Sequence, residues 1–236
     1  MLLLPFDKLP ENFQCDEVRV YYNILYKKRR SLLLKRIFDL VLSAIFIVFL
    51  LIPMIVIAIS IKCTSKGPVL YKQVRVTTYN KKFKIFKFRT MIDGADKKGS
   101  LVTCENDSRV TKIGEFLRKY RLDELPQIFH VFTGKMSFVG TRPEVVKYVE
   151  SYTPVMMATL LMPAGVTSLA SIKFKDEDKI IGDLTDPDEI DRIYIEKILP
   201  KKMRYNLRYI YRFGFRRDIY LMLSTIKHVF IWIFGE

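Results

Sequence analysis

The sequence predicts a mostly helical α+β protein, in which a membrane helix, a small β-hairpin and several amphipathic interfacial helices surround one compact domain. Three observations predict this class. Residues 37–61 form an almost unbroken apolar run, residues 69–76 and 83–88 alternate between apolar and polar side chains, and several segments between residues 110 and 199 carry apolar residues at helical spacing. These patterns are typical of a membrane helix, of strands and of amphipathic helices, respectively.

The apolar run is the strongest local pattern. Residues 40–61 contain no charge over 22 residues, and about 20 suffice to span a bilayer. Basic residues flank the run on both sides, and because Lys and Arg favour the cytoplasmic side, both ends are drawn to one face of the membrane. Pro53 lies inside the run and removes a backbone hydrogen bond. Two topologies stay open: a re-entrant helix broken at Pro53, and an ordinary single span.

The other elements follow from local patterns. Tyr79 and Asn80 lie between the two strands as a turn, and the polar stretch 93–106 predicts a loop. We expect helices at residues 11–26, 110–120, 125–132, 143–152 with a continuation to 161, and 186–199. Residues 201–217 interleave seven Lys or Arg with five aromatic residues, and the apolar stretch 219–234 after them predicts an interfacial helix.

We therefore divide the chain into four parts. Residues 1–30 form an N-terminal extension, residues 31–66 the membrane helix, residues 67–200 a compact domain and residues 201–236 a basic and aromatic membrane-interface segment. The net charge of +15 implies an anionic partner, which leaves nucleic acid, an acidic membrane surface and a polyphosphate substrate open. Three scattered cysteines and two histidines argue against a disulfide framework and a zinc site.

Two adjacent carboxylates, Asp123 and Glu124, stand where one expected helix ends and the next begins. One interpretation is helix capping, with Asp123 as the N-cap and Glu124 in the first turn. The other is catalysis, because Arg118, Lys119 and Arg121 crowd the same stretch. A carboxylate among cations at a helix N-terminus is expected to keep a low pKa. It then stays anionic, as a nucleophile on phosphorus requires.

Further candidate residues lie on either side of this pair. Lys87 and Arg89 lie on the second candidate strand and could offset the charge of a diphosphate. Gly140 permits close backbone approach or a positive φ, and the planar guanidinium of Arg142 suits a phosphate or a base edge. A turn before a helix that begins at Pro143 explains this last stretch equally well.

Five motifs occur together and in order. They are KRIFD at 35–39, QVR at 73–75, FKIFKFRTM at 83–91, LDELPQ at 122–127, and MSFVG at 136–140 followed by Arg142-Pro143. With the Pro-containing apolar run, they resemble the bacterial sugar transferases called monotopic phosphoglycosyl transferases. The resemblance covers residues 31–223. No multi-span stretch precedes Ser31, so the chain resembles the small form of that family.

The resemblance implies an enzyme of the EC 2.7.8 type. It would move a sugar-1-phosphate from a UDP-sugar, expected to be a UDP-N-acetylhexosamine or a derivative, to polyprenyl (undecaprenyl) phosphate and so initiate glycoconjugate assembly. Asp123 would be the nucleophile in a ping-pong mechanism that releases UMP, Glu124 would complete the dyad, and Mg²⁺ would sit at Asp123.

The resemblance also implies contacts and a location. Lys87, Arg89 and Arg118 are the expected phosphate contacts, and Arg142 and Pro143 match the stretch associated with uridine. The family's apolar helix is re-entrant, broken at the proline equivalent to Pro53. The protein would be monotopic in the bacterial inner membrane, bound to anionic lipids, with its catalytic domain on the cytoplasmic face.

Two rival functions explain parts of the sequence. A nucleic-acid binder would account for the charge and the basic, aromatic tail, but not for the apolar run or the LDELPQ motif, so we expect no nucleic-acid partner. A membrane scaffold without activity would use its basic face to bind anionic lipid. The sequence leaves the sugar and the oligomeric state open.

Overall fold

A computed structural model describes residues 3–95, 108–174, 180, 181, 184 and 186–234. The chain begins with two short 3₁₀ helices, η1 (Phe6–Lys8) and η2 (Glu11–Phe13). The helix α1 (Asp16–Lys27) follows and confirms the short helix expected near the N-terminus. It packs on α10 (Leu199–Tyr211) and η6 (Ala158–Leu161) in the main hydrophobic core.

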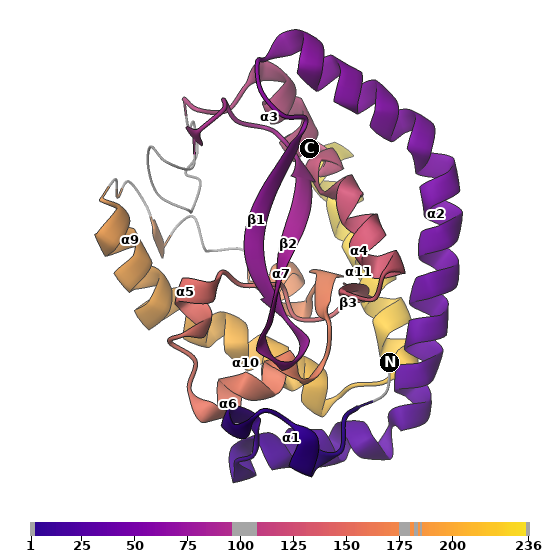
Figure 1. Ribbon diagram of the computed structural model, residues 1–236, viewed down its shortest axis with the longest axis vertical. Coiled ribbons are helices and arrows are strands. Elements are labelled where there is room, and N and C mark those ends of the chain that lie inside the picture. Colours follow the sequence, from indigo (N-terminus) through magenta and orange to yellow (C-terminus); the bar gives the residue numbers. More distant parts are fainter. Residues whose placement is uncertain (1–2, 96–107, 175–179, 182–183, 185, 235–236) are drawn as a thin grey trace.

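The helix α2 (Arg29–Thr64) runs along one side of the molecule and curves over it towards the strand that follows (Figure 1). We predicted that Pro53 breaks this helix, and that prediction is wrong, because helical residues continue through Pro53 to Thr64. A proline removes one backbone hydrogen bond, and a helix adapts by bending rather than ending. Pro53 therefore lies within one continuous helix.

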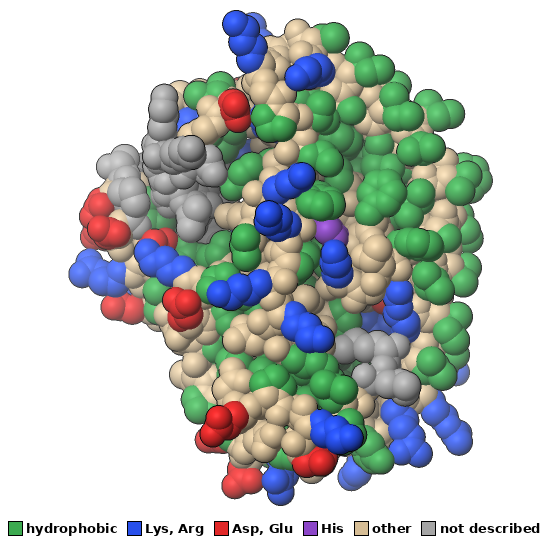
Figure 2. All heavy atoms as spheres, in the orientation of Figure 1, with side chains coloured by type: hydrophobic (Ala, Val, Ile, Leu, Met, Phe, Trp, Pro, Cys, Tyr) green, Lys and Arg blue, Asp and Glu red, His purple; other side chains and the backbone are tan. Residues whose placement is uncertain are grey.

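In a helix of a soluble core, apolar side chains are buried and polar ones are exposed, whereas α2 buries polar side chains and exposes many apolar ones. Lys35, Asp39 and Ser43 are buried, whereas Val48, Phe49 and Ile52 are 72%, 73% and 72% exposed. Figure 2 shows hydrophobic side chains covering the edge of the molecule that α2 forms. Among the described residues, α2 is the one helix long and apolar enough to cross a membrane, which is consistent with membrane association.

The β-hairpin is confirmed. Strand β1 (Leu70–Thr77) pairs antiparallel with β2 (Lys81–Phe88), with Leu70 opposite Phe88. The connecting η3 (Thr78–Asn80) holds Tyr79 at φ 55° and Asn80 at φ 60°. These left-handed residues make the tight turn that the sequence placed there. Within the predicted loop at 93–106, residues 96–106 lie outside the described part of the chain.

A second, parallel sheet was not predicted. It pairs β3 (Met136–Val139) with β4 (Ala164–Thr167). The two strands come so close beyond β3 that a Cβ on Gly140 would lie 2.5 Å from the carbonyl oxygen of Pro163. The close backbone approach expected at Gly140 is confirmed, and its reason is the neighbouring strand.

Most of the helices between and after the strands are shorter than predicted, although the helix expected at 186–199 is confirmed at 187–198 and the one at 169–173 was not predicted. They are α3 (Lys112–Lys119), η5 (Leu122–Gln127), α4 (Ile128–Phe132), α5 (Val146–Val149), α6 (Pro154–Met157), α7 (Leu169–Lys173), α9 (Pro187–Ile193) and the π-helical η7 (Tyr194–Ile198). The helix expected at residues 143–152 is reduced to α5. Glu144 lies before it and is buried, where it accepts a hydrogen bond from Tyr194 at 2.9 Å and pairs with Lys202.

The tail forms α10 and then α11 (Phe215–Phe234), which begins four residues earlier than predicted. Helix α11 contacts α2, β3 and α7. Its buried positions include Asp218 and Leu221, while Tyr220, Leu223 and Ile226 are exposed. The last helix therefore presents an apolar stripe outwards, as α2 does.

Candidate active site

The adjacent carboxylates lie in the 3₁₀ helix η5, which follows a sharp turn after α3. Arg121, at φ 56°, occupies the N-cap position of η5 with no side-chain cap, and Asp123 and Glu124 lie in the first turn. The prediction that Asp123 is the N-cap is therefore wrong. Because Arg121 makes the left-handed turn, Asp123 and Glu124 are not used for capping.

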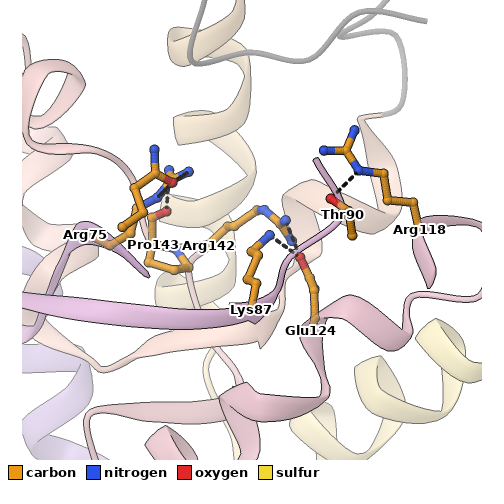
Figure 3. A network of polar contacts seen from close by, with 8 residues as sticks. Arg75, Lys87, Thr90, Arg118, Glu124, Arg142 and Pro143 are labelled. Carbon is orange, nitrogen blue, oxygen red and sulfur yellow. Dashed lines mark hydrogen bonds and ion pairs between the residues drawn. The ribbon is translucent and has the colours of Figure 1, made fainter. Parts of the chain in front are cut away.

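Glu124 is the centre of an ion cluster. Its Oε1 accepts hydrogen bonds from Lys87 Nζ and from Arg142 Nη2, each at 2.8 Å (Figure 3). Lys87 comes from β2, and Arg142 from the segment that follows β3. Three parts of the chain that are distant in sequence thus converge on one carboxylate oxygen.

The two carboxylates differ in electrostatic environment. Burial alone would raise the pKa of Glu124, but the neighbouring Arg142 and Lys87 overcome it and hold the pKa well below the ordinary value. Burial raises the pKa of Asp123, helped by the negative charge of Glu124, and Lys87, Arg121 and Arg118 only partly offset this. Our expectation that the cations keep the pKa of Asp123 low is wrong, because burial and the negative charge of Glu124 outweigh them.

Asp123 is 9% exposed, and no described residue forms an ion pair or hydrogen bond with its carboxylate. Its neighbour Glu124 binds two cations, so the dyad consists of one engaged and one available carboxylate. An available carboxylate beside several cations can act on, or bind near, a phosphate.

The other predicted cations divide into two groups. Arg118 donates from Nε to Thr90 Oγ1 at 2.9 Å, and Figure 3 places it on the far side of Thr90 from Arg142. Arg89 is buried and donates from Nη2 to the carbonyl and hydroxyl oxygens of Ser65, at 2.9 and 2.7 Å. The structure thus brings Lys87 and Arg142 together at Glu124 and directs Arg89 to the end of α2.

The uridine candidates lie beside Arg75, which was not a predicted site residue. Arg75 Nη1 donates to the carbonyl oxygen of Pro143 at 3.2 Å, and its Nε and Nη2 donate to Gln73 (Figure 3). Arg75 and Gln73 belong to the QVR motif of β1. That motif therefore supports the backbone next to Arg142.

His130 is a second residue without a predicted role. Its Nε2 accepts a hydrogen bond from the backbone N–H of Phe86 at 3.2 Å, and its ring packs on Phe83 and Phe86. Burial lowers the pKa of His130 to about 4, so the ring is neutral at physiological pH. His130 links α4 to the strand that carries Lys87. A lone histidine on an apolar helix is the only sequence feature that points to it.

We expected Mg²⁺ at Asp123. Among the described residues, no group of three or more His, Cys, Asp or Glu side chains could hold a metal. Mg²⁺ sites in phosphoryl-transfer enzymes commonly use one or two carboxylates, with substrate phosphates and water as the other ligands. The available carboxylate of Asp123 fits that arrangement.

Comparison with known proteins agrees with this geometry. Residues 30–232 match the sequence profile described as bacterial sugar transferase. The chain is 33% identical over 204 residues to a UDP-glucose:undecaprenyl-phosphate glucose-1-phosphate transferase of Klebsiella pneumoniae, covering 85% of this chain and 41% of that protein. It is 33% identical over 193 residues to an N-acetylgalactosaminephosphotransferase of Aeromonas hydrophila that acts with undecaprenyl phosphate, covering 80% and 42%.

This chain thus spans about two fifths of the length of those two relatives. A Bacillus subtilis sugar transferase, EpsL, is similar along nearly its whole length. It is 31% identical over 201 residues, which cover 85% of this chain and 89% of EpsL. The profile match and these identities, extending through α2, the hairpin, η5 and the tail, show that the chain belongs to the bacterial sugar transferase family.

Proposed function

We propose that this protein transfers a sugar-1-phosphate from a UDP-sugar to polyprenyl phosphate and releases UMP. The observation that carries the proposal is the contrast at η5, where Glu124 is engaged by Lys87 and Arg142 while the adjacent Asp123 is available. The relatives support the reaction class, since their names describe sugar-1-phosphate transfer to undecaprenyl phosphate.

In this proposal Asp123 attacks the β-phosphorus of the UDP-sugar. The bond from that phosphorus to the bridging oxygen breaks, UMP leaves with the electron pair, and the sugar phosphate is held on Asp123 as an acyl phosphate. An oxygen of polyprenyl phosphate then attacks the same phosphorus, and the Asp123 carboxylate is the leaving group. The product is a polyprenyl diphosphate sugar, and the free carboxylate is restored.

The cations have distinct proposed roles. Lys87 and Arg118 contact the diphosphate, and Arg89 contributes positive potential from its buried place at the end of α2. Arg142 and Pro143 bind the uridine end, with Glu124 holding Arg142 in orientation. Mg²⁺, held by Asp123 and the substrate, would offset the charge of the diphosphate.

The membrane placement is part of the proposal. Helix α2 lies in one leaflet as a re-entrant element, bent at Pro53 so that both basic flanks stay on the cytoplasmic face. The exposed apolar stripe of α11 and the basic residues of α10 contact the interface and its anionic lipids. In the bacterial inner membrane, this arrangement lets a soluble UDP-sugar meet a lipid phosphate.

A substrate screen tests the reaction. The protein in nanodiscs, with Mg²⁺ and undecaprenyl phosphate, is offered UDP-glucose, UDP-N-acetylglucosamine, UDP-N-acetylgalactosamine and modified UDP-N-acetylhexosamines, and UMP is measured. The two relatives act on different sugars, and we propose a UDP-N-acetylhexosamine or a derivative as the substrate. If no UDP-sugar releases UMP, the proposed reaction is wrong and a lipid-binding scaffold is the better description. Release of the protein from membranes by high salt would instead favour a nucleic-acid binder.

A further inference from the structure

Three polar residues near the start of α2 bind a single segment of the domain. The side chains of Lys35, Arg36 and Asp39, here called the α2 anchor, form hydrogen bonds with residues between 131 and 139 and, through Lys35, with Asp218 of α11. That segment connects the helix after the carboxylates to the strand that leads to Arg142. Lys35 and Asp39 are both buried.

Lys35 makes the most specific of these contacts. Its Nζ donates to the carbonyl oxygen of Val139 at 2.7 Å and to Oδ2 of Asp218 at 2.6 Å. Tyr209 donates to the other oxygen of Asp218 at 2.9 Å. Val139 is the last residue of β3, three residues before Arg142.

The remaining members hold the two ends of the same segment. Oδ1 of Asp39 accepts a hydrogen bond from the Phe138 N–H at 3.2 Å. Arg36 donates to the carbonyl oxygens of Val131 and Phe132, at 2.7 and 2.8 Å, at the C-terminal end of α4. A cation at that end satisfies carbonyls that lack a helical partner.

These contacts reach both sides of the Glu124–Arg142 ion pair. Glu124 lies in η5, which continues directly into α4, and Arg36 binds the end of α4. Arg142 follows β3, and Lys35 and Asp39 bind the end of β3. The first turns of α2 thus hold, on one rigid helix, the two segments whose separation decides whether Arg142 reaches Glu124.

We propose that Lys35 is a positioning residue of the site, which acts by fixing the end of β3 so that Arg142 and Glu124 meet. A buried ion pair alone is weak evidence for a stabilising role, since apolar residues can often replace it. The hydrogen bonds from the α2 anchor to the backbone of residues 138 and 139 are directional, so they fix where the end of β3 lies. A shift of about 1 Å in the position of reacting groups can lower a rate about 100-fold.

The test compares Lys35→Met, which removes both hydrogen bonds, with Lys35→Arg, which can restore them. Ser43→Ala is the matched control, because Ser43 is buried on α2 but bonds only within its own helix. In nanodiscs we expect Lys35→Met to keep its membrane association and to lose 10- to 100-fold in kcat for UMP release. Lys35→Arg should recover part of this loss, and Ser43→Ala should match the wild type.

A double variant keeps the test valid if an unpaired Asp218 prevents folding. Lys35→Met combined with Asp218→Asn removes the charge that Lys35→Met alone would leave unpaired at position 218. If the pair serves only stability, the double variant should regain the wild-type kcat, and that result would overturn the proposal. A kcat that stays low in the folded double variant supports positioning.

The activity measurement rests on the proposed function, so a second readout is independent of it. Hydrogen exchange of the peptide covering residues 138–142 should be faster in Lys35→Met than in the wild type and unchanged in Ser43→Ala. If the wild type releases no UMP from any UDP-sugar, the proposed function fails while the exchange result still decides the positioning role. Unchanged exchange at 138–142 would refute it.

Discussion

Arg142 Nη2 lies 2.8 Å from Oε1 of Glu124, which joins the segment after β3 to the helix η5. The same oxygen binds Lys87, so three segments depend on one carboxylate. The Glu124 side chain is 12% exposed, whereas those of Lys87 and Arg142 are 25% and 34% exposed. Glu124 is therefore the buried member, and its removal leaves two neighbouring cations without their shared anion.

Replacing Glu124 by glutamine should lower the stability of the protein. We expect the free energy of unfolding to fall by about 1.5–3 kcal/mol, the usual contribution of hydrogen bonds to charged groups. Thermal unfolding followed by circular dichroism would measure the change. Lys147→Met is the matched control, because it removes the surface pair with Asp191, which we expect to contribute about 0–1 kcal/mol. Equal shifts for both variants would contradict the central role of Glu124.

Replacing Asp123 by asparagine should separate chemistry from stability. We expect UMP release to fall by roughly 10³-fold or more, as for other nucleophile substitutions, and no sugar-phosphate adduct to form on the protein. Burial raises the pKa of Asp123 in the folded state, so its charge opposes folding at neutral pH and the neutral variant should melt at the same or a higher temperature. Normal turnover by Asp123→Asn would exclude this residue as the nucleophile.

His130 predicts a pH dependence of stability. Its pKa is lowered to about 4 in the folded state and is about 6.5 when unfolded. The unfolded chain therefore binds a proton first as the pH falls, so the contribution of His130 is complete above about pH 6.5 and is lost between about pH 6.5 and 4. The melting temperature of His130→Gln should depend less on pH across this window than that of the wild type.

Cys63 offers a test of the membrane topology. It is exposed near the C-terminal end of α2, beyond Pro53. In a variant with Cys15 and Cys104 replaced by serine, a membrane-impermeant maleimide should label Cys63 from the cytoplasmic side if α2 is re-entrant. A cysteine introduced at Arg30 should be labelled from the same side. Labelling of the two positions from opposite sides would establish an ordinary span instead.

The hairpin and the long apolar helix were predictable because each depends on a local pattern. Two runs of alternating residues around Tyr79-Asn80 define a hairpin almost without tertiary context. The parallel sheet was not, since β3 and β4 are four residues each and are joined by a crossover that the pattern of neither strand reveals. The short helix α5 likewise reflects tertiary context, because Glu144 is drawn into a buried pair with Lys202.

The sequence predicted which residues make up the candidate site but not which cation pairs with which carboxylate. The motifs identified the carboxylates and the surrounding cations. The partner of each cation depends on how β2, η5 and the end of β3 meet, and this placed Lys87 and Arg142 on Glu124 rather than on Asp123. The pKa of Asp123 was mispredicted because a count of nearby cations in the sequence does not include burial of the carboxylate or the adjacent negative charge of Glu124.

The α2 anchor bears on how this family can be engineered. Because Lys35, Arg36 and Asp39 bind the domain, and Met54 and Ile61 further along α2 pack in its core, the helix is not a detachable module. A shortened chain that starts at Gly67 would lose the support of β3 and α4 together with the hydrophobic segment. A water-soluble version should instead keep the first turns of α2 intact and replace only exposed residues such as Val48, Phe49 and Ile52. Exchange of whole membrane helices between relatives should likewise succeed only when the partners of the anchor are exchanged with them.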